Sequence, residues 1–136
     1  MSTVPVLSDD ALQPQVKAVF DDIRATRRTD RINNFWRALA AADAQLLQST
    51  WTEVKQVMGE PGALDPLVRE LIYVAVSVAN GCSYCVHSHT AAARARGMSE
   101  AQYAELLAIV GLAAKTNHLA TALQVPVDAA FDAQAR

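Results

Sequence analysis

Apolar residues recur at helical spacing along nearly the whole chain. In residues 14–27 they occupy positions i, i+3, i+4 and i+7, which places them on one face of a helix. The same spacing returns in later segments, and no alternating run of apolar and polar residues bounded by turn signals indicates a strand. The sequence therefore predicts an all-α fold, a single-domain bundle of about six helices that spans residues 1–136.

Capping and helix-breaking residues mark where these helices begin and end. Asp43 and Asp65 each stand where a carboxylate accepts amide protons at a helix start. Ser99, followed three positions later by Gln102, matches a capping box. The expected helices span residues 14–27, 34–41, 44–58, 66–80, 82–96 and 100–125. We expect the tail, residues 127–136, to be loosely held or packed on a neighbour.

Composition and charge argue against several classes of protein. Hydrophobic residues make up 51% of the chain and charged residues 19%, which is too apolar for a disordered protein. A formal net charge of -2 with no basic stripe argues against nucleic-acid binding. The longest apolar stretch, residues 71–79, is far shorter than the roughly 20 residues that a membrane span requires. The N-terminus carries acids and lacks a signal-peptide pattern, so we expect a cytoplasmic protein.

The same apolar stretch predicts association between copies of the chain. A helix over residues 71–79 is apolar nearly all round, so it needs neighbours on every side. A domain of this size surrounds few such helices, and the last helix is also rich in Ala and Leu. We therefore expect a homo-oligomer in which a symmetric partner covers the remaining apolar surface.

The two cysteines, Cys82 and Cys85, are the main candidates for functional residues. In a reducing compartment such close spacing indicates a metal site or redox chemistry. One helical turn separates their Cα atoms by a distance within the about 4.4–6.8 Å that a disulfide requires. The preceding pair, Asn80 and Gly81, puts both cysteines in the first turn of a helix, where unpaired N–H groups and the macrodipole stabilise a thiolate.

A histidine and a glutamate are expected beside the cysteines. At about 100° per residue His89 shares the helix face of Cys82 and Cys85, whereas His87 points to the other side and lies outside the site. If the helices on either side of residue 81 pack antiparallel, Glu70 lies beside His89. The spacing then predicts a proton relay from Glu70 through His89 to a cysteine; alternatively, Glu70 is a solvated helix residue.

The order Glu70, eleven residues, Cys82, two residues, Cys85, three residues, His89 resembles the signature of the AhpD branch of the carboxymuconolactone decarboxylase superfamily. The resemblance covers mainly residues 65–117. It implies an AhpD-like helical fold and a thiol peroxidase for hydrogen or organic peroxides, in which Cys85 attacks and Cys82 resolves, without a cofactor. It also implies an external dithiol reductant such as a lipoyl-protein system, and a trimer or a hexamer.

Two points depart from that resemblance. Tyr84 stands where AhpD carries a second histidine, directly before the second cysteine, so the expected relay is simpler. The helix-terminus argument also favours Cys82 slightly as the thiolate, because it is nearer the end, whereas the resemblance assigns the attack to Cys85.

Other functions use the same residues. Cys82, Cys85, His89 and Glu70 are four plausible zinc ligands, although a chain with this much apolar helix does not need a metal to fold. A non-catalytic thiol switch that senses oxidants would also use them. A thioredoxin-like fold is disfavoured, since its CxxC follows a strand.

Overall fold

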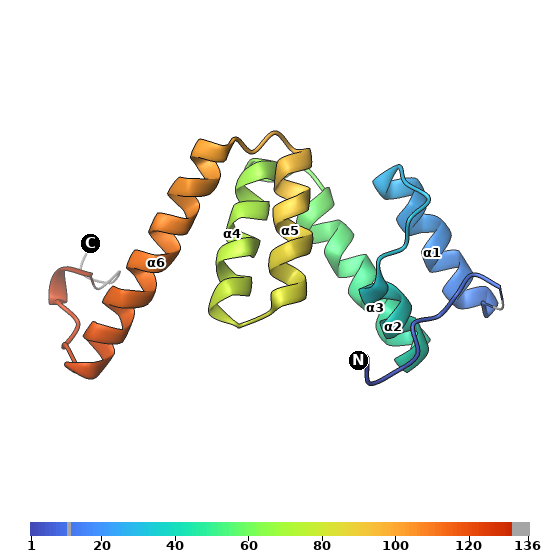
Figure 1. The fold of residues 1–136 in the computed structure, drawn as a ribbon, viewed down its shortest axis with the longest axis horizontal. Coiled ribbons are helices and arrows are strands. Elements are labelled where there is room, and N and C mark those ends of the chain that lie inside the picture. The colour runs from blue at the N-terminus through green and yellow to red at the C-terminus, as the bar shows by residue number, and fades with distance from the viewer. Residues whose placement is uncertain (11, 132–136) are drawn as a thin grey trace. The chain divides into compact units, whose positions relative to one another are not determined.

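The computed structural model describes residues 1–10 and 12–131, and within them every regular element is helical (Figure 1). This confirms the all-α fold expected from the spacing of apolar residues. The six helices are α1 (Pro14–Arg27), α2 (Asn34–Ala42), α3 (Ala44–Val54), α4 (Pro66–Ala79), α5 (Ser83–Ala95) and α6 (Glu100–Ala122), with a π-helical turn η1 (Lys55–Gly59) and a 3₁₀ turn η2 (Ala129–Phe131). None of the helices described is both long and apolar enough to cross a bilayer.

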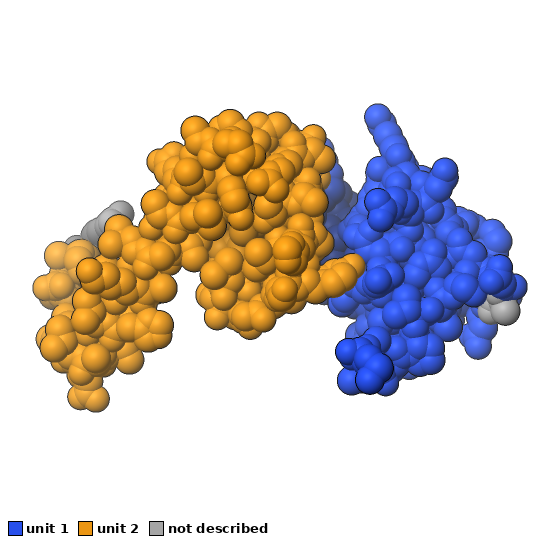
Figure 2. All heavy atoms as spheres, in the orientation of Figure 1, with its two compact units in different colours: residues 1–62 blue, residues 63–136 orange. Residues whose placement is uncertain are grey.

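The chain divides into two compact units, Met1–Gly62 and Ala63–Arg136 (Figure 2). The first unit has its core where α1, α2 and α3 meet. The four residues of α1 at helical spacing are all buried there: Val16, Val19, Phe20 and Ile23. Burying each such side chain stabilises the fold by about 1.5–3 kcal/mol. That the whole chain acts as a single domain stays a prediction.

The predicted helix starts are confirmed by their caps. Asp43 accepts a hydrogen bond from the Leu46 amide at 2.6 Å, and Asp65 accepts one from the Leu67 amide at 2.8 Å. The capping box at the start of α6 has both of its hydrogen bonds, one from each of its two residues. These caps satisfy amide groups that have no partner inside the helix.

Two helix ends differ from the expected ones by more than one residue. The helix expected to run to residue 58 ends as α3 at Val54 and continues as the π-helical turn η1. The last helix ends at Ala122 rather than near residue 125, because Gln124 has a left-handed φ of 47° and the residue before Pro126 is disfavoured in a helix. The tail includes η2, and its residues 132–136 lie outside the described residues.

The second unit is built on a tight hairpin of α4 and α5, which lie side by side and antiparallel in Figure 1. Gly81 turns the chain with a φ of 68°, a left-handed conformation that glycine adopts without strain. The Cys82 amide then donates to the Ser77 carbonyl at 2.9 Å and closes the turn. Because the connection is so short, residues about equally far from it on the two helices lie at the same level.

The apolar residues of α6 are mostly exposed. The helix contacts α4, yet Leu106 is its one buried residue in the described chain. Leu107, Ile109 and Leu112 are 47%, 58% and 62% exposed. The last helix is thus rich in apolar residues, as expected, but this chain leaves most of them uncovered.

Candidate functional site

Cys82 and Cys85 form a disulfide at the start of α5, with their Cα atoms 5.3 Å apart. Cys82 is the N-cap residue rather than the first helical residue, and its Sγ accepts a hydrogen bond from the Cys85 amide at 3.2 Å. Both sulfurs thus lie at the positive end of the helix macrodipole, which stabilises a thiolate when the disulfide is reduced. The proximity predicted from the spacing is confirmed, and one sulfur doubles as a helix cap.

Glu70 and His89 meet across the hairpin. Glu70 is only 4% exposed, and its Oε2 lies 2.8 Å from Nδ1 of His89. An ionised carboxylate only accepts hydrogen bonds, so Nδ1 must carry the proton that it donates. In a neutral ring that leaves Nε2 unprotonated and able to act as a base. The hairpin register predicted this contact; the alternative of a solvated Glu70 is excluded by its burial.

Arg96, at the end of α5, is a second donor to the same carboxylate. Its Nε donates to Oε1 of Glu70 at 3.2 Å. The two oxygens of Glu70 are therefore divided between His89 and Arg96. Arg96 was not among the residues predicted from the sequence, although it stands seven positions after His89, two helical turns along the same face.

The buried carboxyl of Glu70 is ionised in this setting. Burial alone raises its pKa, because a charge is poorly solvated inside a protein. The hydrogen bonds and charges of His89 and Arg96 outweigh burial, so the pKa of Glu70 lies below its ordinary value. At neutral pH the carboxylate can thus serve as a hydrogen-bond acceptor for the imidazole.

Tyr73 packs against the imidazole from α4. Its ring stacks on that of His89 with centroids 3.6 Å apart and planes 18° from parallel. Tyr73 is three positions after Glu70, on the same face of α4, so helical spacing could have found it. Stacking fixes the plane of the imidazole, and the carboxylate fixes its rotation within that plane.

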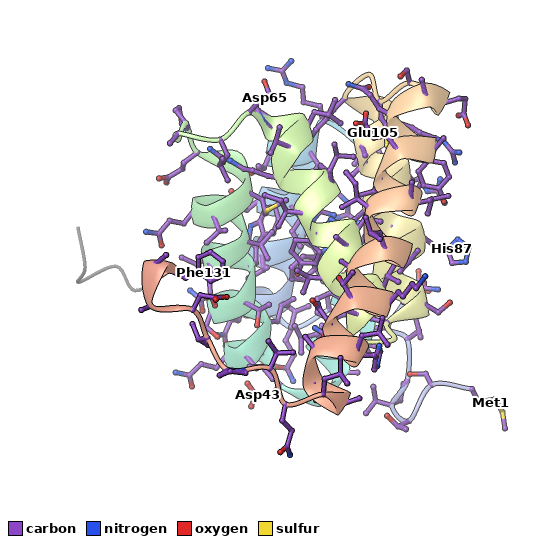
Figure 3. All side chains as sticks on the ribbon, turned by 90° about the vertical axis from the view of Figure 1, so that its left-hand side faces the viewer. Met1, Asp43, Asp65, His87, Glu105 and Phe131 are labelled. Carbon is purple, nitrogen blue, oxygen red and sulfur yellow. A yellow bond between two sulfur atoms is a disulfide. The ribbon has the colours of Figure 1, made fainter. Side chains whose placement is uncertain are left out.

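The remaining candidates lie away from these contacts. In the described part of the chain His89 hydrogen-bonds to Glu70 and to neither sulfur, so its approach to the cysteines stays a prediction. His87 is exposed and points away from the helices (Figure 3), as the spacing predicted. Tyr84 is 44% exposed. Among the described residues no three His, Cys, Asp or Glu side chains are gathered so as to hold a metal ion.

Comparison with known sequences gives a match to one family and to several relatives. The family model for the "Carboxymuconolactone decarboxylase family" matches residues 45–128. An uncharacterised protein of Cupriavidus necator is 38% identical over 84 residues, which are 62% of this chain and 73% of that protein.

Two relatives are named alkyl hydroperoxide reductase AhpD. That of Solibacter usitatus is 40% identical over 73 residues, 54% of this chain and 39% of the relative. That of Azorhizobium caulinodans is 33% identical over 87 residues, 62% of this chain and 48% of the relative. The chain thus spans less than half the length of these two proteins.

One solved structure is similar over almost the whole chain. It is the alkylhydroperoxidase AhpD core from Rhodospirillum rubrum, which is 65% identical and superposes with a TM-score of 0.93. The match covers 96% of this chain and 97% of that chain. The predicted AhpD-like fold is confirmed.

Proposed function

This chain belongs to the carboxymuconolactone decarboxylase family, and we propose that within it the protein is a thiol-dependent peroxidase for hydrogen peroxide or organic hydroperoxides. The observation that carries the proposal is the cysteine pair, closed as a disulfide at a helix N-terminus. On the same hairpin a buried carboxylate holds His89 in the tautomer of a base. The AhpD names of the similar proteins agree with this chemistry.

The proposed cycle is balanced by the two thiols. The thiolate of Cys85 attacks a peroxide oxygen, the O–O bond breaks, and the alcohol or water leaves with a proton while Cys85 becomes a sulfenic acid. Cys82 then attacks that sulfur, water leaves, and the disulfide forms. In sum, one hydroperoxide and two thiols give one alcohol, one water and one disulfide. An external dithiol reduces the disulfide by exchange, and no cofactor takes part.

The choice of Cys85 as the attacking residue rests on the family resemblance. The helix terminus favours the other sulfur, since Sγ of Cys82 is the one that accepts a backbone hydrogen bond. Trapping of the sulfenic acid in the two single Cys→Ser variants decides between them.

In this proposal Glu70 and His89 form a proton relay in which His89 carries the proton and Glu70 stays ionised, and neither residue binds a metal. Nε2 of His89 accepts the thiol proton, directly or through a water, and later protonates the leaving oxygen. Glu70 stabilises the imidazolium that forms between these steps, over the 2.8 Å hydrogen bond. Groups of this kind contribute about 10²–10⁴-fold to a rate.

The proposed partners are a peroxide, a dithiol reductant of the lipoyl-protein type and further copies of the chain in a trimer or a hexamer. Exposed apolar residues on α4 and α6 support the oligomer; they include Ile72, Val76, Leu107, Ile109 and Leu112. The cytoplasm is the expected compartment, because there the disulfide would be reduced again after each turnover.

A peroxide-consumption assay tests the function. Reduced protein without a reductant should consume one peroxide per chain and end as the disulfide, whereas added dithiothreitol should sustain many turnovers. The Cys82→Ser, Cys85→Ser double variant should consume none, and His87→Gln, outside the proposed site, should match the wild type. If the wild type stops after one equivalent with reductant present, the protein is a redox-sensing switch. If one zinc per chain co-purifies and its removal unfolds the helices, the residues form a zinc site, and neither the peroxidase nor the redox-sensing switch applies.

A further inference from the structure

Glu70 has two donors, and only one of them belongs to the proposed relay. Nδ1 of His89 donates a hydrogen bond to Oε2. Nε of Arg96, at the far end of α5, donates one to Oε1 over 3.2 Å. The carboxylate itself is 4% exposed. A buried carboxylate with one oxygen unpaired would be strongly destabilised, so the second donor is part of what permits a charge at this position.

We propose that Arg96 is a positioning residue that keeps Glu70 ionised and directs its second oxygen at His89. The proposal assigns a further residue to the proposed peroxidase site, and its effect on turnover rests on that proposed function. Arg96 touches neither the sulfurs nor the imidazole in the described hydrogen bonds and ion pairs. It acts only through the carboxylate.

The geometry gives Arg96 two separate effects. Its charge lowers the proton affinity of Glu70, which keeps the proton on Nδ1 of His89 and leaves Nε2 as the base. Its Nε–H group also fixes the carboxylate plane, so that Oε2 faces the imidazole across the hairpin. Without Arg96 the buried Glu70 would bind a proton more readily and would then compete with His89 as its holder.

No other charged side chain in the described chain pairs with Glu70. Across the hairpin, α5 supplies His89 and Arg96. On α4 itself the neighbouring Tyr73 stacks on the imidazole, and no charged residue of α6 forms an ion pair with the carboxylate in the described structure. The electrostatic setting of Glu70 therefore depends on two donors, and removing one should be visible in its titration.

The chain offers a matched control two positions away. Arg94 lies on the same last turn of α5, but it pairs with the exposed Glu100 at 3.5 Å and lies over the ring of Tyr103. Arg94→Gln removes one positive charge from the same helix end without touching Glu70. Arg96→Gln removes the charge that Glu70 contacts, and Arg96→Lys keeps a charge while losing the planar guanidinium.

The primary test is independent of peroxide. The disulfide form, labelled with ¹³C at the glutamate carboxyls, is titrated by NMR, and the Glu70 signal among the five glutamates is assigned with Glu70→Gln. In Arg96→Gln the pKa of Glu70 should rise by about one pH unit relative to wild type, since an adjacent opposite charge shifts a carboxyl by that order. Arg94→Gln should leave it unchanged, and Arg96→Lys should fall between wild type and Arg96→Gln.

A second measurement compares the pKa of Glu70 with the pH dependence of peroxide consumption. The acid limb of the pH profile for peroxide consumption should move upward in Arg96→Gln by the same amount, whereas a merely structural role would lower the rate at every pH and leave the limb in place. An unchanged Glu70 titration in a folded Arg96→Gln protein would overturn the proposal, as would an equal shift in Arg94→Gln. If the wild type consumes no peroxide, the proposed function fails, and the titration still decides whether Arg96 holds Glu70 ionised.

Discussion

The ring of Tyr73 lies face to face with the imidazole of His89, with centroids 3.6 Å apart. The contact holds the plane of the proposed base without using its nitrogens. Tyr73→Phe keeps the stacked ring and should retain peroxide consumption close to wild type. Tyr73→Leu should lower kcat about two- to tenfold, because aromatic pairs are worth about 0.5–1.5 kcal/mol. Stopped-flow kinetics of both variants measures this, and equal rates for Leu and Phe would contradict it.

His89→Ala should lower the rate of peroxide reduction by about 10²–10⁴-fold, because it removes the proposed acid-base group. The helices should remain folded because His89 is not one of the buried core residues, although the variant should lose some stability as Oε2 of Glu70 loses its donor. Circular dichroism checks the fold, and single-turnover kinetics measures the rate. A variant that reduces peroxide at the wild-type rate would remove His89 from the mechanism.

Sulfenic acid trapping distinguishes the two cysteines. In Cys82→Ser treated with peroxide, dimedone should label Cys85, because the resolving thiol is gone. In Cys85→Ser little label should form if Cys85 is the attacking residue. Peptide mass spectrometry locates the adduct. Label found in Cys85→Ser alone would assign the attack to Cys82, whose sulfur has the backbone donor.

The pKa of Glu70 predicts how stability depends on pH. Because the pKa is lower in the folded protein than its ordinary value of 4.5, the ionised carboxylate stabilises the fold above about pH 4.5. That contribution is lost as the pH falls through the folded-state pKa. The free energy of unfolding of wild type minus that of Glu70→Gln, from urea titrations, should therefore shrink as the pH drops below about 4.5. A difference that stays constant from pH 7 to pH 3 would contradict the ionised state.

Light scattering at micromolar concentration should give the mass of a trimer or a hexamer. Leu112 is 62% exposed on α6, so Leu112→Glu should weaken association by placing a charge on the apolar surface. Glu105→Gln, on the same helix, keeps the size of a polar side chain and serves as the control. A single-chain mass that persists as the protein is concentrated would show that this surface needs no partner.

The sequence could predict contacts that follow from helical and hairpin register. Glu70 lies eleven residues before Gly81 and His89 eight after it, so a tight antiparallel turn brings them to within one helical turn of the same level. Arg96 is the C-cap residue of α5, and its long side chain has many possible conformations. Its bond to Glu70 depends on a rotamer, which residue spacing does not determine.

Helix ends were less predictable than helix faces. Cys82 belongs by spacing to the helix, but its backbone is non-helical, since a cap residue contributes its side chain and not its dihedrals. The π-helical turn after Val54 gave no signal in the apolar pattern. The sequence predicted only that some apolar surface would need a partner to cover it. It did not predict that most of α6 would be exposed in this chain, because the spacing of apolar residues does not show what packs against them.

The short turn at Gly81 also bears on how the site assembles during folding. The hydrogen bonds of Glu70, the stacking of Tyr73 on His89 and the disulfide all join residues between positions 70 and 96. Closing so short a loop carries a small entropic penalty, and contacts of low sequence separation form early. The hairpin can therefore bring its reactive groups together before more distant parts of the chain have found their partners. Substitutions in the first unit should therefore change the stability of the protein more than the reactivity of its cysteines.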